Sequence, residues 1–151
     1  MAKKKRKFGV GRRMLNAAVR PMAQHGWGPS FWYMVSVRGR KSGLERSTPL
    51  AVMELGGHRW LVASYGVVDW VRNVRAADEV TLTRGGHAET FHPTEVSATE
   101  AVPVLREYLR TIRVARPYFD ATVDSTDEDF AVEASRHPVF RLDSPPESPA
   151  V

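Results

Sequence analysis

Apolar and polar residues alternate along much of the chain with the period of two that is typical of β-strands. The clearest example is residues 31–37, where both sets of alternate positions carry apolar or small side chains. The glycine pairs Gly56-Gly57 and Gly85-Gly86 separate further runs of this kind and are typical of hairpin turns. We therefore expect other strands at residues 46–55, 59–64, 79–84 and 87–95, and a last edge strand at 138–142.

Three segments show helical spacing instead. In the first, residues 14–24, apolar side chains share one face, and Pro21 should interrupt or bend the helix. The second begins after Asp69, a candidate N-cap, and the third begins with a capping box at Ser97. The expected helices are residues 14–24, 70–77 and 98–113, and residues 124–128 are expected to form an acidic loop.

Short strands with glycine turns and a few helices favour a small barrel over a parallel sheet. The expected fold class is therefore mainly β (α+β), with flanking N-terminal and C-terminal helices. The 151 residues are enough for one domain with a real core. We place this domain at residues 14–143, after a basic flexible tail at 1–13 and before a disordered, Pro- and Ser-rich tail at 144–151.

Several classes of function are excluded by composition. The chain has no cysteine, so disulfides, thiol catalysis and cysteine-bound metal centres are ruled out. Its five histidines show no paired ligand spacing, and we expect no metal site. No apolar run approaches the roughly 20 residues that span a bilayer, and no apolar signal core follows the first lysines. We expect a cytoplasmic protein.

The net charge of +5 is concentrated at one end of the chain. Residues 1–13 hold seven Lys and Arg and no acid, so the rest of the chain carries a net charge of −2. A basic tail on a slightly acidic body makes nucleic acid an unlikely partner. With the amphipathic helix at 14–24, this tail could instead contact an anionic membrane surface peripherally, at the inner face. The alternative is a helix that packs over the barrel, with a tail that is only solvated.

The segment most suggestive of ligand binding is residues 39–50, a basic turn between two apolar runs. Gly39 and Gly43 would let backbone N–H groups approach a ligand closely. Arg40 and Arg46 can hold phosphate or carboxylate oxygens in bidentate fashion, and Lys41 adds a third cation. The turn therefore predicts a small anionic ligand, although an ordinary solvated hairpin would look similar.

A second stretch extends this pattern. Residues 60–66 form a strand that ends in Val62-Ala63-Ser64, and residues 69–77 follow with Trp70 and Asn73 spaced as W-x-x-N. The G-R-K-S-G turn at residues 39–43, with the later Arg46 and Pro49-Leu50, precedes this stretch. The motifs in this order resemble those of the deazaflavin (coenzyme F420)-dependent nitroreductase and quinone reductase family. The resemblance covers roughly residues 26–91.

The resemblance implies a split β-barrel like that of pyridoxamine-phosphate-oxidase (PNPOx-like) flavin-binding proteins, and a homodimer. It also implies an oxidoreductase that uses coenzyme F420 (8-hydroxy-5-deazaflavin). The basic turn would hold the anionic tail, and the strand end with the short helix would enclose the flat ring. The implied cofactor-binding residues are Val35, Ser36, Arg40, Lys41, Ser42, Gly43, Arg46, Pro49, Val62, Ala63, Ser64, Tyr65, Trp70 and Asn73.

The expected reaction is hydride transfer from the reduced coenzyme to a small organic acceptor: a quinone, a nitro compound or an activated double bond. Tyr65 and Tyr118 are the catalytic candidates, because a phenol can hydrogen-bond charge that develops on the acceptor. Each could equally be an ordinary packing residue. The loop at 65–69 is shorter than in the quinone reductases, which leaves the acceptor open. The alternatives are an FMN-binding split barrel and a non-catalytic barrel tethered by its tail.

Overall fold

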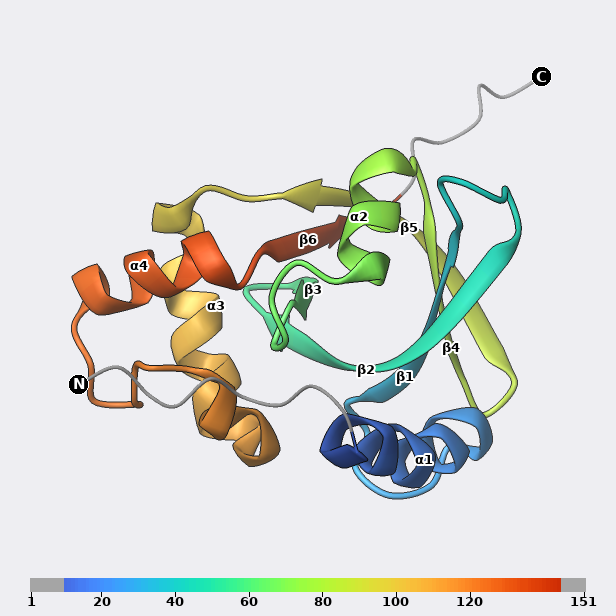
Figure 1. Cartoon of the computed structure of the whole chain (residues 1–151), viewed down its shortest axis with the longest axis horizontal. Coiled ribbons are helices and arrows are strands. Elements are labelled where there is room, and N and C mark those ends of the chain that lie inside the picture. Colours follow the sequence, from blue (N-terminus) through green and yellow to red (C-terminus); the bar gives the residue numbers. More distant parts are fainter. Residues whose placement is uncertain (1–9, 145–151) are drawn as a thin grey trace.

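The computed structural model describes residues 10–144, and its centre is a closed barrel of six antiparallel strands (Figure 1). The strands follow one another around the barrel in the order β1-β2-β3-β6-β5-β4. Alternating apolar residues explain this architecture, because each strand must bury side chains on one or both faces. The strands are β1 (Trp32–Arg38), β2 (Glu45–Leu55), β3 (His58–Val62), β4 (Val80–Arg84), β5 (His87–Glu95) and β6 (Val139–Asp143).

Helices cover part of this barrel. Figure 1 shows α3 and α4 beside one another at the β3 and β6 side, while α1 lies across the ends of β1 and β2. The short α2 lies between β3 and β4 in sequence and packs its buried face on the barrel residues. The helices are α1 (Val10–His25), α2 (Asp69–Ala76), α3 (Ala98–Thr111), the 3₁₀ helix η1 (Arg113–Tyr118) and α4 (Asp127–Arg136).

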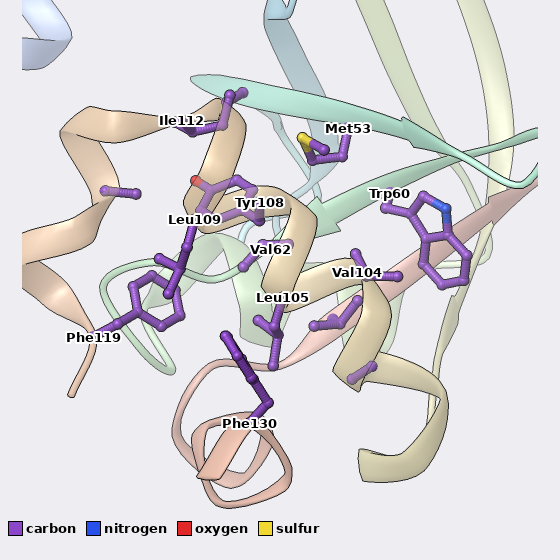
Figure 2. Close-up of a cluster of buried hydrophobic side chains, with 14 of the residues drawn as sticks. Met53, Trp60, Val62, Val104, Leu105, Tyr108, Leu109, Ile112, Phe119 and Phe130 are labelled. Atoms are coloured by element: carbon purple, nitrogen blue, oxygen red, sulfur yellow. The ribbon is translucent and has the colours of Figure 1, made fainter. Parts of the chain in front are cut away.

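The core has two separate parts. The first fills the barrel and combines inward-facing strand residues with the buried face of α2. The second lies outside the barrel, between the strands and helices α1, α3, η1 and α4. Figure 2 shows how α3 contributes Leu105, Tyr108 and Leu109 to this outer core, opposite Met53 and Val62 of the strands. Side chains on the two faces of one strand therefore belong to different compartments.

All six strands agree with the sequence-based expectation to within two residues. The expected edge position of the last strand is wrong, because β6 pairs with β3 on one side and β5 on the other. Closure of the barrel removes the edge that Pro138 had suggested. The expected N-cap at Asp69 is also wrong: Val68 precedes α2, without a side-chain hydrogen bond.

The expected acidic loop near residues 124–128 instead leads into α4. Thr126 and Asp129 form a capping box, with each side chain accepting from the other residue's backbone N–H. Asp127 and Glu128 occupy the first turn, where negative charge is favoured by the helix dipole. The acidic residues that suggested a loop therefore belong to the beginning of a helix.

Helix α1 begins at Val10, earlier than expected, and continues through Pro21. Residues 10–13 of the expected basic tail are thus helical, while residues 1–9 and 145–151 lie outside the described part of the chain. Within residues 10–144, no helix combines the length and the hydropathy needed to cross a membrane.

Candidate functional site

The basic turn between β1 and β2 has a fixed backbone conformation. The Gly39 N–H donates to the Leu44 carbonyl at 2.7 Å, and the Gly43 N–H donates to the Gly39 carbonyl at 2.9 Å. Gly43 has a φ of +72°, in the left-handed region that favours glycine. A Cβ at position 39 would lie 2.9 Å from the Ser42 hydroxyl oxygen and 3.1 Å from the Leu44 carbonyl oxygen, so a larger residue would be crowded there. Both glycines therefore shape the turn.

Arg40 is held by α2. The Oδ1 atom of Asn73 accepts from the Arg40 guanidinium at 2.7 Å and from the Arg40 backbone N–H at 3.1 Å. Asp69 lies 3.7 Å from the same guanidinium. Asn73 therefore holds both the side chain and the backbone of Arg40. The N–H groups of Gly39, Arg40 and Gly43 bond within the protein, so the expected convergence of these amides on a ligand is wrong.

An open cleft of about 710 Å³ lies beside this turn, and we call it the basic cleft. Four cations and two carboxylates line it, so its net charge is positive. Among the expected residues, Arg40, Lys41, Ser42, Arg46, Trp70 and Asn73 are present here. Arg20 of α1 completes the set and donates to the Ser47 carbonyl at 3.5 Å. Cationic side chains on three separate elements make this cleft suited to an anionic ligand.

Two further expected residues lie near the basic cleft without lining it. The Ser36 hydroxyl is 2.7 Å from that of Ser47, its cross-strand partner, which does line the cleft. Gly43 lines a neighbouring groove on the other side of the turn, together with Ser36. Their contribution to a ligand in the cleft would therefore be indirect.

A second, mostly apolar hollow adjoins the basic cleft, and we call it the apolar slot. It lies between the start of β1, the middle of β2, the end of β3, helix α1, and the segment from α3 to η1. Trp70 lines both the slot and the basic cleft, so the two are neighbours. The slot holds about 40 Å³ of free volume, enough for only a few water molecules. Expected residues that line it are Pro49, Val62, Ser64, Tyr65, Trp70 and Tyr118.

Val35 and Ala63 are absent from both hollows. Each faces the barrel interior, with exposed fractions of 2% and 0%. The physical reason is the strand period of two: Val62 and Ser64 face the slot, so Ala63 between them faces inward. The expectation that consecutive residues of this strand end all face the ligand is therefore wrong for Ala63, and Val35 follows the same rule on β1.

Hydroxyl groups supply the polar atoms of the slot. The Ser64 and Tyr108 hydroxyl oxygens are 2.6 Å apart. Burial raises the pKa of Tyr108 to about 12, against a smaller opposing effect of the Ser64 hydrogen bond. Tyr108 therefore stays a neutral phenol at physiological pH. Near the slot's rim, the rings of Tyr65 and Tyr118 meet edge to face, with centroids 4.6 Å apart.

The sequence-based expectation missed Tyr108 and Arg20. A usable signal existed for Tyr108, because positions 105, 108, 109 and 112 share one face of α3 by helical spacing. No comparable signal pointed to Arg20 of α1. Among residues 10–144, no group of three or more His, Cys, Asp or Glu is arranged to hold a metal ion.

The chain is similar to known proteins in sequence and in fold. A family model described as F420H(2)-dependent quinone reductase matches residues 13–135. No curated protein matches the sequence significantly. A solved structure described as a domain-swapped dimer aligns with a TM-score of 0.58 at 18% identity, over 88% of this chain and 97% of that one.

Two other solved structures share this fold. The F420-H2 dependent reductase FDR-A aligns with a TM-score of 0.51 at 21% identity, over 75% of this chain and 94% of that one. A Clostridium acetobutylicum protein of the pyridoxinephosphate oxidase family, related to general stress protein 26 of B. subtilis, has a TM-score of 0.50 at 11% identity, over 87% and 82%. The expected split β-barrel fold is thereby confirmed.

Proposed function

Because the chain belongs to the F420H(2)-dependent quinone reductase family, we propose that it reduces a small organic acceptor with hydride from the reduced coenzyme. The chain is an oxidoreductase, and its cofactor is coenzyme F420. The acceptor classes that we propose are quinones, nitro compounds and activated double bonds, each of which consumes one hydride and one proton in a two-electron reduction.

The observation that carries this proposal is the meeting of the basic cleft and the apolar slot at Trp70. Coenzyme F420 joins a flat ring, through a ribityl chain, to a phosphodiester and a glutamate tail. A ligand with one apolar end and one anionic end fits a cationic hollow beside an apolar one. Arg40, Lys41 and Arg46 would hold the tail, and Pro49 and Val62 would contact the ring.

When bound, the coenzyme supplies a hydride from the central carbon of its ring. The chain has to hold ring and acceptor about 3 to 3.5 Å apart and exclude water. Pro49, Val62 and Trp70 provide apolar walls for this purpose. With about 40 Å³ free, the slot has to widen when the ring enters. The rim formed by Tyr65 and Tyr118 is the part that we expect to separate.

Hydride addition to a quinone or nitro group leaves negative charge on an acceptor oxygen. A phenol hydroxyl within hydrogen-bond reach stabilises that charge and can deliver the proton that completes reduction. Tyr65 and Tyr118 both line the slot, which supports this role for either one. We further propose that the enzyme acts as a homodimer; one solved structure of the same fold is described as a domain-swapped dimer.

Binding and turnover with two cofactors test this function. Purified protein is titrated with F420 and with FMN, and oxidation of reduced F420 is then followed with a quinone and with a nitroaromatic compound. We expect saturable F420 binding, weaker FMN binding, and acceptor-dependent oxidation. Tight FMN binding without F420 binding would identify the FMN-dependent alternative. F420 binding without turnover would leave a binding protein and contradict the proposed catalysis.

A further inference from the structure

Two buried ionisable side chains lie behind the apolar slot without lining it. Glu133 and His137 have exposed fractions of 1% and 7%. Glu133 belongs to the last turns of α4, and His137 is the residue that ends this helix. Neither belongs to the site described above. A buried charge persists only when partners hold it, so the contacts of this pair indicate what it does.

His137 contacts the end of β3. Its Nδ1 atom lies 2.8 Å from the Ala63 carbonyl oxygen, and because that oxygen can only accept, Nδ1 carries a proton. The Ala63 N–H in turn donates to the Pro138 carbonyl at 2.9 Å. His137 and the next residue therefore fix both backbone polar groups of Ala63. Ser64 and Tyr65, which follow directly, line the slot; we call residues 63–65 the first wall.

Glu133 contacts the opposite side of the slot. Its Oε1 atom accepts from the backbone N–H groups of Asp120 and Ala121 at 2.9 and 3.0 Å. This segment follows Tyr118, which lines the slot and meets Tyr65. Phe119 stacks on the His137 ring, with centroids 4.0 Å apart. We call residues 118–121 the second wall.

The two side chains are joined to each other. His137 Nε2 lies 3.3 Å from Glu133 Oε2, which has no hydrogen-bond partner among the described residues. Since Nδ1 already donates to a carbonyl, this contact is attractive when Nε2 is also protonated, as in an imidazolium–carboxylate pair. Arg136 adds a cation 3.4 Å from Oε1.

The carboxylate is correspondingly stabilised in its charged form. Burial alone would raise the pKa of Glu133, but His137 and the backbone N–H groups of Ala121 and Asp120 together hold it below its ordinary value. His137 and Glu133 therefore connect the first wall to the second wall without a break.

We propose that Glu133 and His137 are positioning residues that fix the spacing between the two walls of the apolar slot. The identity of the ligand, the coenzyme ring, rests on the proposed function. The connection between the two walls does not depend on it. Neither residue touches the ring. Loosening the pair lets the walls move independently, which disorders the rim at Tyr65 and Tyr118 and weakens ring binding while leaving the basic cleft intact.

Two substitutions separate the connections. His137→Phe retains a ring to stack on Phe119 but removes both polar contacts. His137→Asn retains an amide donor for the Ala63 carbonyl but is too short to reach Glu133. Val132→Ala, on the same helix with a 58% exposed side chain, is the matched control. Amide hydrogen exchange is measured by NMR on the protein without coenzyme, with the buried Leu82 of β4 as the internal reference.

We expect His137→Phe to accelerate exchange at the Ser64 and Ala121 amides about tenfold or more relative to Leu82. His137→Asn should accelerate exchange at Ala121 and leave Ser64 near the wild-type rate. In parallel, His137→Phe should raise the Kd for F420 about five- to fiftyfold, with Val132→Ala unchanged. Equal acceleration at all three amides would mean a general loss of stability, and no acceleration would mean no connection.

Equal acceleration at all three amides, or no acceleration at any of them, overturns the proposal. If His137→Phe does not fold, His137→Asn alone decides through the ratio of the Ala121 and Ser64 rates. If wild-type protein binds no F420, the proposed function fails, yet the exchange measurements still confirm or overturn the connection between the walls.

Discussion

Asn73 accepts two hydrogen bonds from Arg40, at 2.7 Å from the guanidinium and 3.1 Å from the backbone N–H. The residues are 33 positions apart, and their contact ties the basic turn to α2. Trp70, which lines both hollows, belongs to the same helix. The position of the cation and the position of the aromatic wall are thus set by one element.

Asn73→Ala should loosen Arg40 and leave its backbone N–H without a protein partner. We expect a loss of about 1 to 3 kcal/mol in the free energy of unfolding. The affinity for F420 should fall with it, because the cation is no longer held in place before the ligand binds. Denaturant unfolding and an F420 titration measure the two effects. Unchanged F420 affinity would show that the cleft does not depend on this contact.

Ala63→Leu should destabilise the fold. Ala63 is fully buried in the barrel interior, so a larger side chain overpacks that core, at a cost of about 1 to 3 kcal/mol. The slot itself should remain open, since Ala63 does not line it. Thermal unfolding of the variant gives the stability change. A fully stable variant that cannot bind F420 would place Ala63 at the ring after all.

Tyr108 should make stability depend on alkaline pH. Its pKa is raised from 10.0 to about 12 in the folded protein, so its contribution is fully present below pH 10. Between these values the unfolded chain loses the phenol proton first, and stability falls by about 1.4 kcal/mol per pH unit. Unfolding free energies of wild type and Tyr108→Phe, compared from pH 8 to 12, isolate this effect. Parallel curves would contradict it.

Tyr65→Phe and Tyr118→Phe keep the ring volume and remove only the hydroxyl. If one of these hydroxyls stabilises charge on the acceptor, its loss should lower turnover about ten- to thousandfold with little change in F420 affinity. Steady-state kinetics combined with an F420 titration separate the two quantities. Normal turnover in both variants would assign the proton to water.

The alternating pattern predicted the strands well because period-two burial is a local property. It could not tell which face belonged to the slot, since both faces of β1 and β3 are apolar: one fills the barrel and the other meets the helices. That is why the prediction included Val35 and Ala63, which face the barrel interior, together with Val62 and Ser64, which line the slot. Helix α4 was missed because its acidic start looks like a solvated loop.

The contacts that organise the site could not be predicted from the sequence, for a different reason. His137 and Ala63 are 74 positions apart, and only closure of the barrel between β3 and β6 brings their segments together. A lone histidine without paired ligand spacing gives no sign of such a contact. By contrast, the basic turn was recognisable, because its cations and glycines are close in the sequence and the turn depends on local geometry.

The most direct measurement of the central claim compares F420 with its ring and ribityl fragment, which lacks the phosphodiester and glutamates. Both ligands are titrated into wild type, Arg40→Ala/Arg46→Ala, and Arg110→Ala, a matched loss of an exposed cation on α3. The double variant should lose about 2 to 5 kcal/mol of binding free energy for F420 and little for the fragment. Arg110→Ala should bind both ligands as wild type does. Wild-type affinity of the double variant for the whole coenzyme would contradict binding of the anionic tail in the basic cleft.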